Sequence, residues 1–500
     1  MGAQSGEPRL AQRGRPIAVA LASLVAIGAI VTDAAPWLRG PAPYPPEWQW
    51  GWRAEPGRPL VLAALVAAAV AALLAASIGR RARARPRAAA RVLLAGSTVL
   101  GLLFAVALLR REPEGALRSL MARAQSFSIT SYHTVAASED ARSPLGFLRA
   151  HARLLPELAR TAKHAATHPP GPVLWYRAAI GLCATSPALT AGLLDLAGAP
   201  GPESQTPERR AIRAGALLGA LGFALLAALT VWPLARLAEG LGLAPLPAAR
   251  VALPFVLLPG PALFAGSLDA ALALPVTGFA ALVLAAARAE EPRRAFALAA
   301  AAGASAAVAL FGSYGSMAFL ALAGLAVAAA RAGDRRALAR AARVGAVAAA
   351  VAALLAFGLP ALLGHEPLLA LRTALALHRA EYTAPRSYAL WLVFDPIDLA
   401  LFAGLPFALL ALWRTVTAER AAGAARSLGR FGRAVVAGLA ALVLAGVTRG
   451  EVGRLWIPLV PLLLLASAGP DEDATGLVAT VLPAALAAAF TLAMASRWTF

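Results

Sequence analysis

The sequence predicts an all-α polytopic membrane protein, and three observations support this fold class. The chain has 500 residues, of which 59% are hydrophobic and 14% are charged, whereas soluble domains carry roughly 25% charged residues. Its mean hydropathy is +0.68. Long apolar runs recur along the chain, and a helix needs about 20 apolar residues to cross a bilayer. Backbone groups in lipid must bond within the protein, and the alternating pattern of barrel strands does not recur, so helical crossings are predicted.

The apolar runs predict about thirteen transmembrane helices. The first run follows Arg9, Arg13 and Arg15 and looks like a secretory signal, but we interpret it as a retained helix because no small-residue cleavage site follows it. The predicted helices lie near residues 17–32, 59–79, 90–109, 172–198, 212–236, 269–288, 295–312, 315–331, 342–363, 398–415, 432–448, 453–469 and 475–495.

Arginine clusters predict the orientation of these helices. Positive residues concentrate in cytoplasmic loops, and five short connections are rich in arginine: 80–91, 209–213, 288–294, 331–343 and 414–433. The sequence therefore predicts a multi-pass protein of the plasma or inner membrane with a cytoplasmic N-terminus. The net charge of +20 is explained by these clusters. No nucleic-acid partner is predicted, because a nucleic-acid-binding stripe requires a soluble face.

One apolar segment, 248–266, does not fit a simple crossing. It contains Pro254, Pro259 and Pro261, and proline breaks helices. Counting it as a full crossing would place the arginines at 288–294 outside the cell. We therefore predict a kinked or re-entrant segment that returns to the outer face and leaves Asp269 there.

The outer loops define the predicted organisation of the chain. Residues 1–89 form a two-helix segment, 90–470 a transmembrane module with long outer loops at 110–170 and 365–397, and 471–500 a C-terminal helix. Residues 145–164 have the spacing of a helix that lies in the membrane interface. A further outer loop, 33–58, is rich in aromatic residues that suit an interfacial belt: Trp37, Tyr44, Trp48, Trp50 and Trp52.

A proline-rich motif closes the first long loop and opens a helix. It reads Thr167-His168-Pro169-Pro170-Gly171-Pro172. Two prolines fix an extended entry, and a further proline at the helix start costs little. The motif therefore predicts that His168 is held rigidly at the membrane surface. The alternative is a helix-start signal with an incidental histidine.

Together with the long outer loop and its interfacial helix, this motif resembles the GT-C superfamily of membrane glycosyltransferases. That superfamily includes the protein mannosyltransferase and aminoarabinose transferase type enzymes. Over roughly residues 90–470, three further stretches look like bacterial members: Ser267-Leu268-Asp269, His378-Arg379-Ala380-Glu381-Tyr382 followed by Trp391 and Asp395, and Arg449-Gly450-Glu451-Val452-Gly453-Arg454-Leu455-Trp456.

The resemblance implies transfer of a sugar from a polyprenyl-phosphate-linked donor to a glycan, lipid or protein acceptor at the outer face of the membrane. A carboxylate would take the proton of the attacking hydroxyl. The family's early loop acid has no counterpart in residues 128–135, so the catalytic candidates are Asp33, Glu139, Asp140 and Asp269. The candidates for binding the donor phosphate or substrate are His168, His378, Arg379, Tyr382, Arg449, Glu451 and Arg454.

Each candidate has a structural alternative. Asp33 and Asp269 lie at predicted helix ends, where capping alone explains them. Glu139 and Asp140 suit a solvated loop. Glu451 and Arg454 suit an ordinary ion pair on one helix. His378 and Arg379 suit side chains that reach from a helix to the membrane interface.

Two other functions remain open from the sequence: a secondary transporter or lipid flippase, and a catalytically silent GT-C-like protein. Transporters bind substrates near the bilayer midplane, whereas the polar residues here are predicted at one surface, which favours an enzyme. No cofactor is predicted, although outer carboxylates leave a divalent metal open. No glycine-rich phosphate loop is present, so a nucleotide-sugar donor is not expected.

Overall fold

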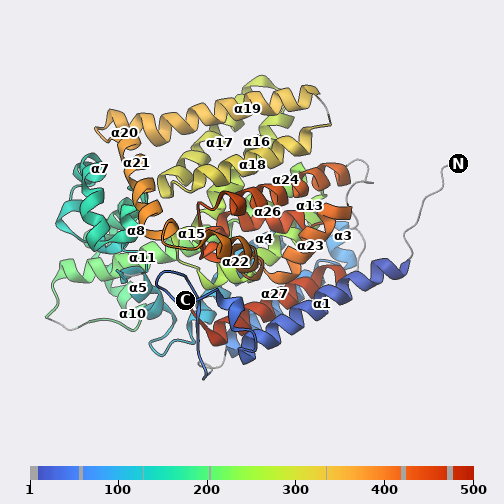
Figure 1. Ribbon diagram of the computed structural model, residues 1–500, viewed down its shortest axis with the longest axis horizontal. Coiled ribbons are helices and arrows are strands. Elements are labelled where there is room, and N and C mark those ends of the chain that lie inside the picture. The colour runs from blue at the N-terminus through green and yellow to red at the C-terminus, as the bar shows by residue number, and fades with distance from the viewer. Residues whose placement is uncertain are drawn as a thin grey trace.

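The structure is a computed structural model that describes residues 9–55, 60–127, 129–201, 204–333, 335–417, 424–469 and 477–500. Arg420 and the predicted boundary at residue 471 lie outside these ranges. The described chain is almost entirely helical, as the sequence predicts. Its helices run side by side along the long axis of the molecule (Figure 1).

The first half of the chain contains twelve α-helices and one short strand among the described residues. In order, these elements and the intervening 3-10 turns are α1 (Arg9–Thr32), η1 (Pro36–Arg39), β1 (Gly51–Trp52), α2 (Val61–Ala76), α3 (Arg80–Ala84), α4 (Pro86–Leu109), α5 (Ala116–Gln125), α6 (Tyr132–Ala136), η2 (Glu139–Ala141), α7 (Pro144–Thr161), α8 (Lys163–Ala166), α9 (Gly171–Thr185), α10 (Pro187–Leu196), α11 (Pro207–Leu229) and α12 (Val231–Gly240).

The second half continues with broken helices and longer spans. Its elements are α13 (Pro245–Ala252), η3 (Leu253–Leu257), α14 (Pro259–Leu263), α15 (Leu268–Ala271), α16 (Ala273–Arg288), α17 (Pro292–Gly312), α18 (Ser316–Arg331), α19 (Arg335–Ala353), η4 (Leu354–Gly358), α20 (Leu359–Leu362), α21 (Pro367–His378), η5 (Arg379–Thr383), α22 (Tyr388–Phe402), α23 (Leu405–Thr417), α24 (Ala424–Ala445), α25 (Val452–Leu455), η7 (Ile457–Leu459), α26 (Val460–Ala466), α27 (Leu477–Arg497) and β2 (Trp498–Thr499). Strand β2 pairs antiparallel with β1.

Seven helices in the described part of the chain are long and apolar enough to cross a membrane, or up to nine if two bent pairs each count as one span. The seven are Pro86–Leu109, Pro207–Gly240, Leu268–Arg288, Pro292–Gly312, Arg335–Leu362, Arg426–Ala445 and Thr480–Arg497. Each predicted span overlaps a helix, and several of these helices are shorter apolar ones such as Val61–Ala76. The chain therefore has the helices of a membrane protein, while the total of about thirteen crossings stays a prediction.

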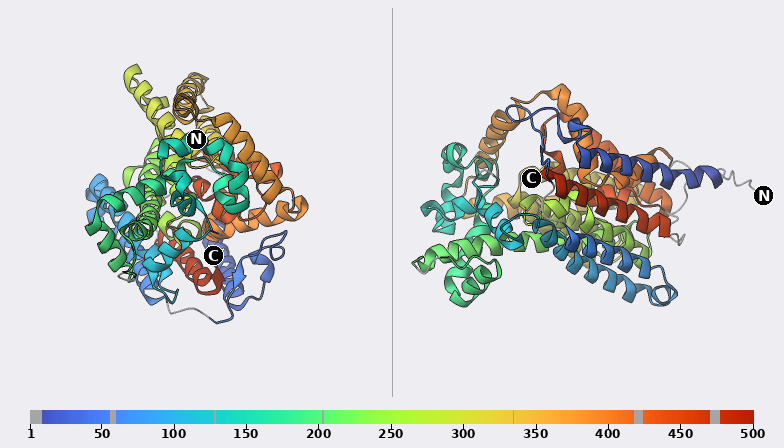
Figure 2. Two further views of the ribbon diagram at one scale, coloured as in Figure 1. Left: turned by 90° about the vertical axis from the view of Figure 1, so that its left-hand side faces the viewer. Right: turned by 90° about the horizontal axis from the view of Figure 1, so that it is seen from below.

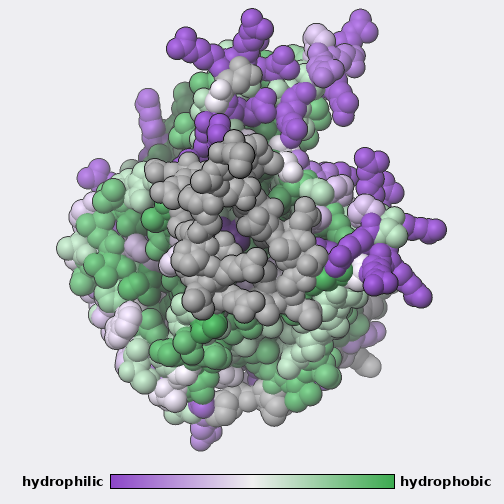
Figure 3. All heavy atoms as spheres, turned by 90° about the vertical axis from the view of Figure 1, so that its right-hand side faces the viewer, coloured by the Kyte–Doolittle hydropathy of each residue, from purple (hydrophilic) through white to green (hydrophobic). Residues whose placement is uncertain are grey.

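Four of the five arginine-rich connections lie at one end of the bundle, which we call the arginine-rich end. Hydrogen bonds link neighbouring connections there: Arg250 Nε donates to Ser77 Oγ at 3.0 Å, Arg340 Nη1 to Ala289 O at 3.5 Å, and Ser427 Oγ to Ala330 O at 3.2 Å. Arg288 also donates to the carbonyl of Gly240. Figure 3 shows strongly hydrophilic side chains around the edge of this end, with apolar side chains over much of the remaining surface.

The fifth connection, 209–213, lies at the opposite end, contrary to the prediction. Arg142, from the loop 110–170, pairs with Glu208 at 3.4 Å, and Arg213 donates to Ala199 O at 2.9 Å. The teal and green helices α7 to α11 gather at this end in Figures 1 and 2. We call it the cavity end, because it contains the cavities described below.

The segment 172–198 does not form the single crossing that the sequence predicts. It divides into α9 and α10, which are bent by 110° at Ser186, where the serine caps α10 and Pro187 begins it. Helix α9 runs antiparallel to α11: Tyr176 lies against Gly219 and Ile180 against Gly215. Helices α11 and α12 together form one span, 207–240, of 34 residues. It is therefore about 51 Å long, well beyond a bilayer core of about 30 Å. Helices α9 and α10 pack on the part of it nearest the cavity end, so this segment starts and ends at that end.

The segment 248–266 also differs from the prediction, because it crosses the bundle. It begins near Arg250 at the arginine-rich end and leads to Gly266, which packs against Leu120 at the cavity end. Its prolines do break it into short helices, as predicted. The broken backbone is tolerated because its residues are buried in protein. The bundle thus loses one predicted crossing at 172–198 and gains one at 248–266. Asp269 therefore still lies at the end of the bundle where the sequence predicts it.

Candidate functional site

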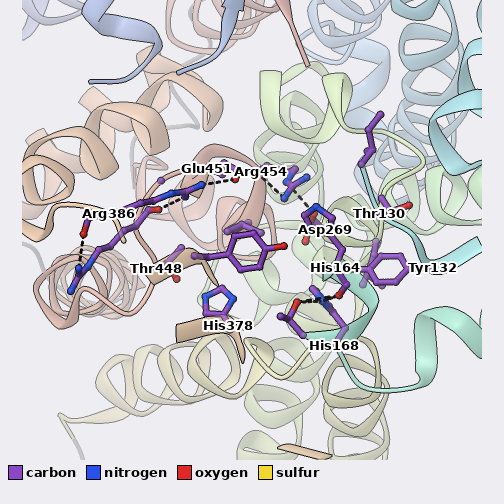
Figure 4. Close-up of a pocket in the computed structure, with 17 residues that line it drawn as sticks. Thr130, Tyr132, His164, His168, Asp269, His378, Arg386, Thr448, Glu451 and Arg454 are labelled. Carbon is purple, nitrogen blue, oxygen red and sulfur yellow. Dashed lines mark hydrogen bonds and ion pairs between the residues drawn. The ribbon is translucent and has the colours of Figure 1, made fainter. Parts of the chain in front are cut away.

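Two adjoining cavities open among the loops at the cavity end. The main cavity has a volume of about 480 Å³ and the side cavity a volume of about 50 Å³. They share lining residues, including Tyr132, Asp269 and Arg454. Their walls come from the loop 110–170, from α15, from the loop after α21 and from the turn before α25 (Figure 4). Segments far apart in the sequence therefore converge on one site.

Seven of the candidate residues line the side cavity. They are His168, Asp269, His378, Tyr382, Arg449, Glu451 and Arg454. Asp269, Tyr382, Glu451 and Arg454 also line the main cavity.

The turn that holds Glu451 is shaped by strain and by buried carboxylates. Glu451 has a φ of 59° and Gly450 a φ of 87°, and positive φ is costly for a side chain such as glutamate. Asp395 Oδ1 accepts from Gly450 N at 3.0 Å, and Asp398 Oδ2 accepts from Gly453 N at 2.8 Å. These two aspartates of α22 fix the turn and hold the side chain of Glu451 at the cavity wall.

Glu451 and Arg454 form the core of a buried charge cluster. Arg454 Nη2 pairs with Glu451 Oε2 at 2.9 Å, and Arg386 Nη2 pairs with Glu451 Oε1 at 3.4 Å. Burial raises the pKa of Glu451, but the two arginines outweigh it and hold that pKa below its ordinary value. Glu451 therefore stays ionised and is a poor proton acceptor.

Asp269 is bound more loosely than Glu451. Its Oδ2 lies 3.7 Å from Arg454 Nε, beyond hydrogen-bond distance. Ser267 caps the short helix α15, with its Oγ accepting from Ala270 N at 3.3 Å, and this places Asp269 in the first turn. Figure 4 shows Asp269 beside Arg454, on the side of His164 and Tyr132. Of the two carboxylates, Asp269 is the one that arginine engages less closely.

His168 is neutral and fixed in one tautomer. Its Nδ1 lies 2.8 Å from His164 O, and a carbonyl only accepts, so Nδ1 carries the proton and Nε2 is an acceptor. Tyr132 packs against the ring edge-on, with the ring centroids 5.3 Å apart. Burial lowers the pKa of His168 to about 3. A rigid, uncharged acceptor at the cavity wall suits recognition of a hydroxyl group.

A second group of rings comes from the loop after α21. The Tyr382 ring lies 5.8 Å from that of His164 and 5.6 Å from that of His378. Burial raises the pKa of Tyr382 to about 12, so the phenol is a hydrogen-bond donor at neutral pH. Tyr382 lies in the π-helical segment η5, His378 ends α21 and His164 lies in α8. Arg379, the first residue of η5, is exposed and lines neither cavity.

Three acidic candidates are also kept away from the cavities. Asp33 pairs with Arg39 at 3.0 Å in the turn after α1. Glu139 and Asp140 lie exposed on η2, where Glu139 pairs with Arg142 at 2.9 Å. The solvated-loop interpretation is therefore the one that the structure favours for Glu139 and Asp140.

Arg449 lines the side cavity but is occupied by the main chain. Its Nη1 donates to Thr383 O at 3.0 Å and Arg386 O at 2.7 Å, and its Nε donates to Gly446 O at 3.1 Å. The guanidinium also lies 5.3 Å from the centre of the Tyr388 ring. Arg449 therefore braces the loop against the turn instead of facing a ligand.

The aromatic loop 33–58 lies partly in the wall of the main cavity, and not only in an interfacial belt as predicted. Trp50 is 3% exposed and its Nε1 donates to Asp398 Oδ1 at 2.9 Å. Trp37 is exposed, and Tyr44 is exposed but also lines the main cavity. Glu47 accepts from Trp391 Nε1 at 2.7 Å, which ties this loop to α22.

Several other lining residues were not among the site candidates, although Glu381 belongs to the stretch 378–382 singled out above. They are Arg123, Tyr132, Lys163, His164, Glu381 and Arg386. Lys163 and Glu381 pair at 2.7 Å and join the two long loops beside the cavity. Arg386 had a usable signal, since it lies between the histidine-tyrosine stretch and Asp395.

A metal centre is not indicated by the part of the chain that the structure describes. Those residues contain no group of three or more His, Cys, Asp or Glu side chains arranged to hold a metal ion. Comparison of the chain with family models, with curated proteins and with solved structures finds no match.

Proposed function

We propose that this protein is a membrane glycosyltransferase that moves a sugar from a polyprenyl-phosphate-linked donor to an acceptor hydroxyl. The single observation that carries the proposal is the pairing of Asp269 with a cluster of cations at one cavity wall. Asp269, Arg454 and Arg386 all line the main cavity. A proton acceptor beside groups that bind a phosphate leaving group is what such a transfer requires.

In the proposed reaction, the acceptor hydroxyl oxygen attacks the anomeric carbon of the donor sugar. Asp269 takes the hydroxyl proton as the new carbon–oxygen bond forms. The bond between the anomeric carbon and the phosphate oxygen breaks, and its electron pair leaves on the phosphate. Arg386 and Arg454 bind that phosphate, which makes it a better leaving group. Direct attack of this kind inverts the configuration of the sugar.

Glu451 and His168 have supporting roles in this proposal. Glu451 pairs with both arginines, so it fixes their direction without acting as the base. His168 Nε2 accepts a hydrogen bond from a sugar or acceptor hydroxyl. The aromatic side chains of the main cavity, among them Trp48, Trp50 and Phe264, supply apolar surface for the faces of a sugar ring.

The proposal extends to the fold and its orientation. We infer a GT-C-like module with about thirteen crossings, whose arginine-rich end lies in the cytoplasm. On this basis the cavities open at the outer face, where a lipid-linked sugar and its acceptor meet. The membrane itself supplies the lipid-linked donor from the side.

The test is sugar transfer by purified, detergent-solubilised protein with a panel of polyprenyl-phosphate sugars and a membrane extract as the acceptor source. The proposal predicts a labelled product with at least one donor. The same protein is reconstituted in vesicles that contain fluorescent lipid-linked sugar. Movement of that lipid between leaflets, without transfer from any donor, would replace the enzyme with a flippase or transporter. Absence of both activities would favour a catalytically silent GT-C-like protein.

A further inference from the structure

Four side chains form a separate charge cluster near the main cavity, which we call the Arg123 cluster. Glu112 Oε1 lies 2.9 Å from Arg111 Nε, 3.3 Å from Arg53 Nη2 and 3.9 Å from Arg123 Nη2. In the described part of the chain, the ion pairs of these three arginines all go to Glu112. With three arginines and one glutamate, the cluster therefore has a net charge of +2.

Arg123 is the least engaged of the three arginines. Arg111 is fully engaged, because it donates to the carbonyls of Ala495 and Trp498 and stacks on Phe500 at 5.5 Å. Arg123 has weaker contacts: Nη1 lies 3.4 Å from Leu263 O, and its ion pair with Glu112 is too long for a hydrogen bond. Its side chain is only 22% exposed, so water compensates little of this charge. Burial accordingly lowers the pKa of Arg123.

Arg123 lines the main cavity, at a place distinct from the Glu451 turn. It lies on α5, whose Leu120 packs against Gly266. The cavity wall then continues along residues 265–269 to Asp269. One stretch of wall thus connects the Arg123 cluster with the carboxylate that faces Arg454.

We propose that the Arg123 cluster is a second anion-binding subsite, which binds a phosphate group of the acceptor. A phosphate monoester carries about two negative charges at neutral pH, which matches the surplus of the cluster, and arginine binds phosphate through parallel hydrogen bonds. The donor phosphate then binds at Arg386 and Arg454, and the acceptor phosphate at Arg123. Identification of the ligand as the acceptor rests on the proposed function, whereas the phosphate site itself does not.

The test measures binding without turnover. Native mass spectrometry of the purified protein is titrated with farnesyl phosphate, and with farnesol as the uncharged control for apolar binding. The wild type is expected to bind two molecules of farnesyl phosphate. Arg123→Gln should lose one of them, with affinity at that site falling by about tenfold or more. Arg118→Gln, an exposed arginine of the same helix, should still bind two.

Two further variants keep the test decisive if Arg123→Gln fails to fold. Arg123→Lys keeps the charge and should retain the second molecule with weaker affinity. Glu112→Gln removes the competing carboxylate and should tighten binding at this site, a direction that general destabilisation would not produce. Competition by inorganic phosphate separates the sources: displacement at millimolar phosphate shows that the phosphate group alone is recognised, and resistance shows that the lipid is needed as well.

Retention of two bound molecules in Arg123→Gln would overturn the inference. A wild type that binds no farnesyl phosphate would also overturn it. So would a wild type that binds one molecule with an affinity that Arg123→Gln leaves unchanged. Since turnover is not measured, a protein that binds two phosphates but transfers no sugar would contradict the proposed function and leave this subsite standing.

Discussion

The guanidinium of Arg454 is bound to the carboxylate of Glu451, three residues earlier in the chain, at 2.9 Å. Both side chains are mostly buried, with 16% and 11% of their surfaces exposed. The pair lies in a strained turn, since Glu451 has a φ of 59°. A buried pair of this kind is maintained by its surroundings and is costly to break.

Glu451→Gln should therefore destabilise the protein by about 3–5 kcal/mol, because it leaves Arg454 and Arg386 without their shared counter-charge. The pKa of Glu451 is lowered in the folded state, so its contribution is present above its ordinary pKa and is lost as the pH falls through the lowered value. Unfolding in detergent at several pH values measures this. The gap in melting temperature between wild type and variant should be widest near pH 7 and shrink below the ordinary glutamate pKa of 4.5.

Glu208→Gln is the matched control, because Glu208 pairs with Arg142 on the exposed surface. Its effect should stay within about 0.5 kcal/mol. Equal effects of the two substitutions would contradict the role assigned to the Glu451 pair.

Asp398→Asn should loosen the turn without removing a charge that lines the main cavity. Asp398 accepts from both Trp50 Nε1 and Gly453 N, and an asparagine can accept only through one oxygen. We expect a loss of about 1–3 kcal/mol in the free energy of unfolding, together with reduced transfer. Asp140→Asn, on an exposed turn, serves as the control in the same unfolding assay. A fully stable and active Asp398→Asn would show that the turn needs no such anchor.

The burial of His151 should make the folded protein less stable in mild acid. It is 1% exposed on α7, and burial, followed by the nearby His365, lowers its pKa to about 3. The unfolded chain binds this proton near pH 6.5 and the folded chain does not. The free energy of unfolding should therefore fall by about 1.4 kcal/mol per pH unit below pH 6.5 on account of this residue. His151→Gln should flatten the slope of melting temperature against pH, and an unchanged slope would exclude His151 as the cause.

Because Glu208 pairs with Arg142, we predict that the segments around residues 140 and 208 lie on the same side of the membrane. Single cysteines at residues 140 and 208 should both be labelled from the outer side in intact cells. Cysteines at residues 293 and 336, at the arginine-rich end, should be labelled only after permeabilisation. The background is Cys183→Ser, which removes the buried native thiol. Labelling of residue 208 from the cytoplasmic side would restore the single crossing over 172–198.

The sequence was sufficient to predict the helical class because apolar composition and span length are local properties. It also indicated seven of the residues that line the side cavity, His168 and Glu451 among them. It misplaced 172–198 because its apolar residues pack on α11, and hydropathy does not distinguish packing on a helix from contact with lipid. A single crossing over 172–198 places the arginines at 209–213 at the same end as the other clusters, whereas the bend at Ser186 leaves them at the cavity end.

The contacts within the site could not be derived from the sequence. Asp33 and Asp269 both suited a helix end, and only the fold shows that Arg39 engages the first while the second faces a cavity. The Arg123 cluster joins the segments around residues 53, 111 and 123, and no local pattern links residue 53 to the other two. Long-range packing decides which charges face a substrate.

The most direct test of the central claim compares Asp269→Asn with Asp140→Asn in the transfer assay. Both substitutions replace a carboxylate by an amide of nearly the same shape, but only Asp269 lines the main cavity. If Asp269 takes the acceptor proton, kcat of Asp269→Asn falls by about 10²–10⁴, while the fold and the binding of farnesyl phosphate persist and Asp140→Asn stays at wild-type activity. Wild-type turnover by folded Asp269→Asn would contradict the proposed reaction.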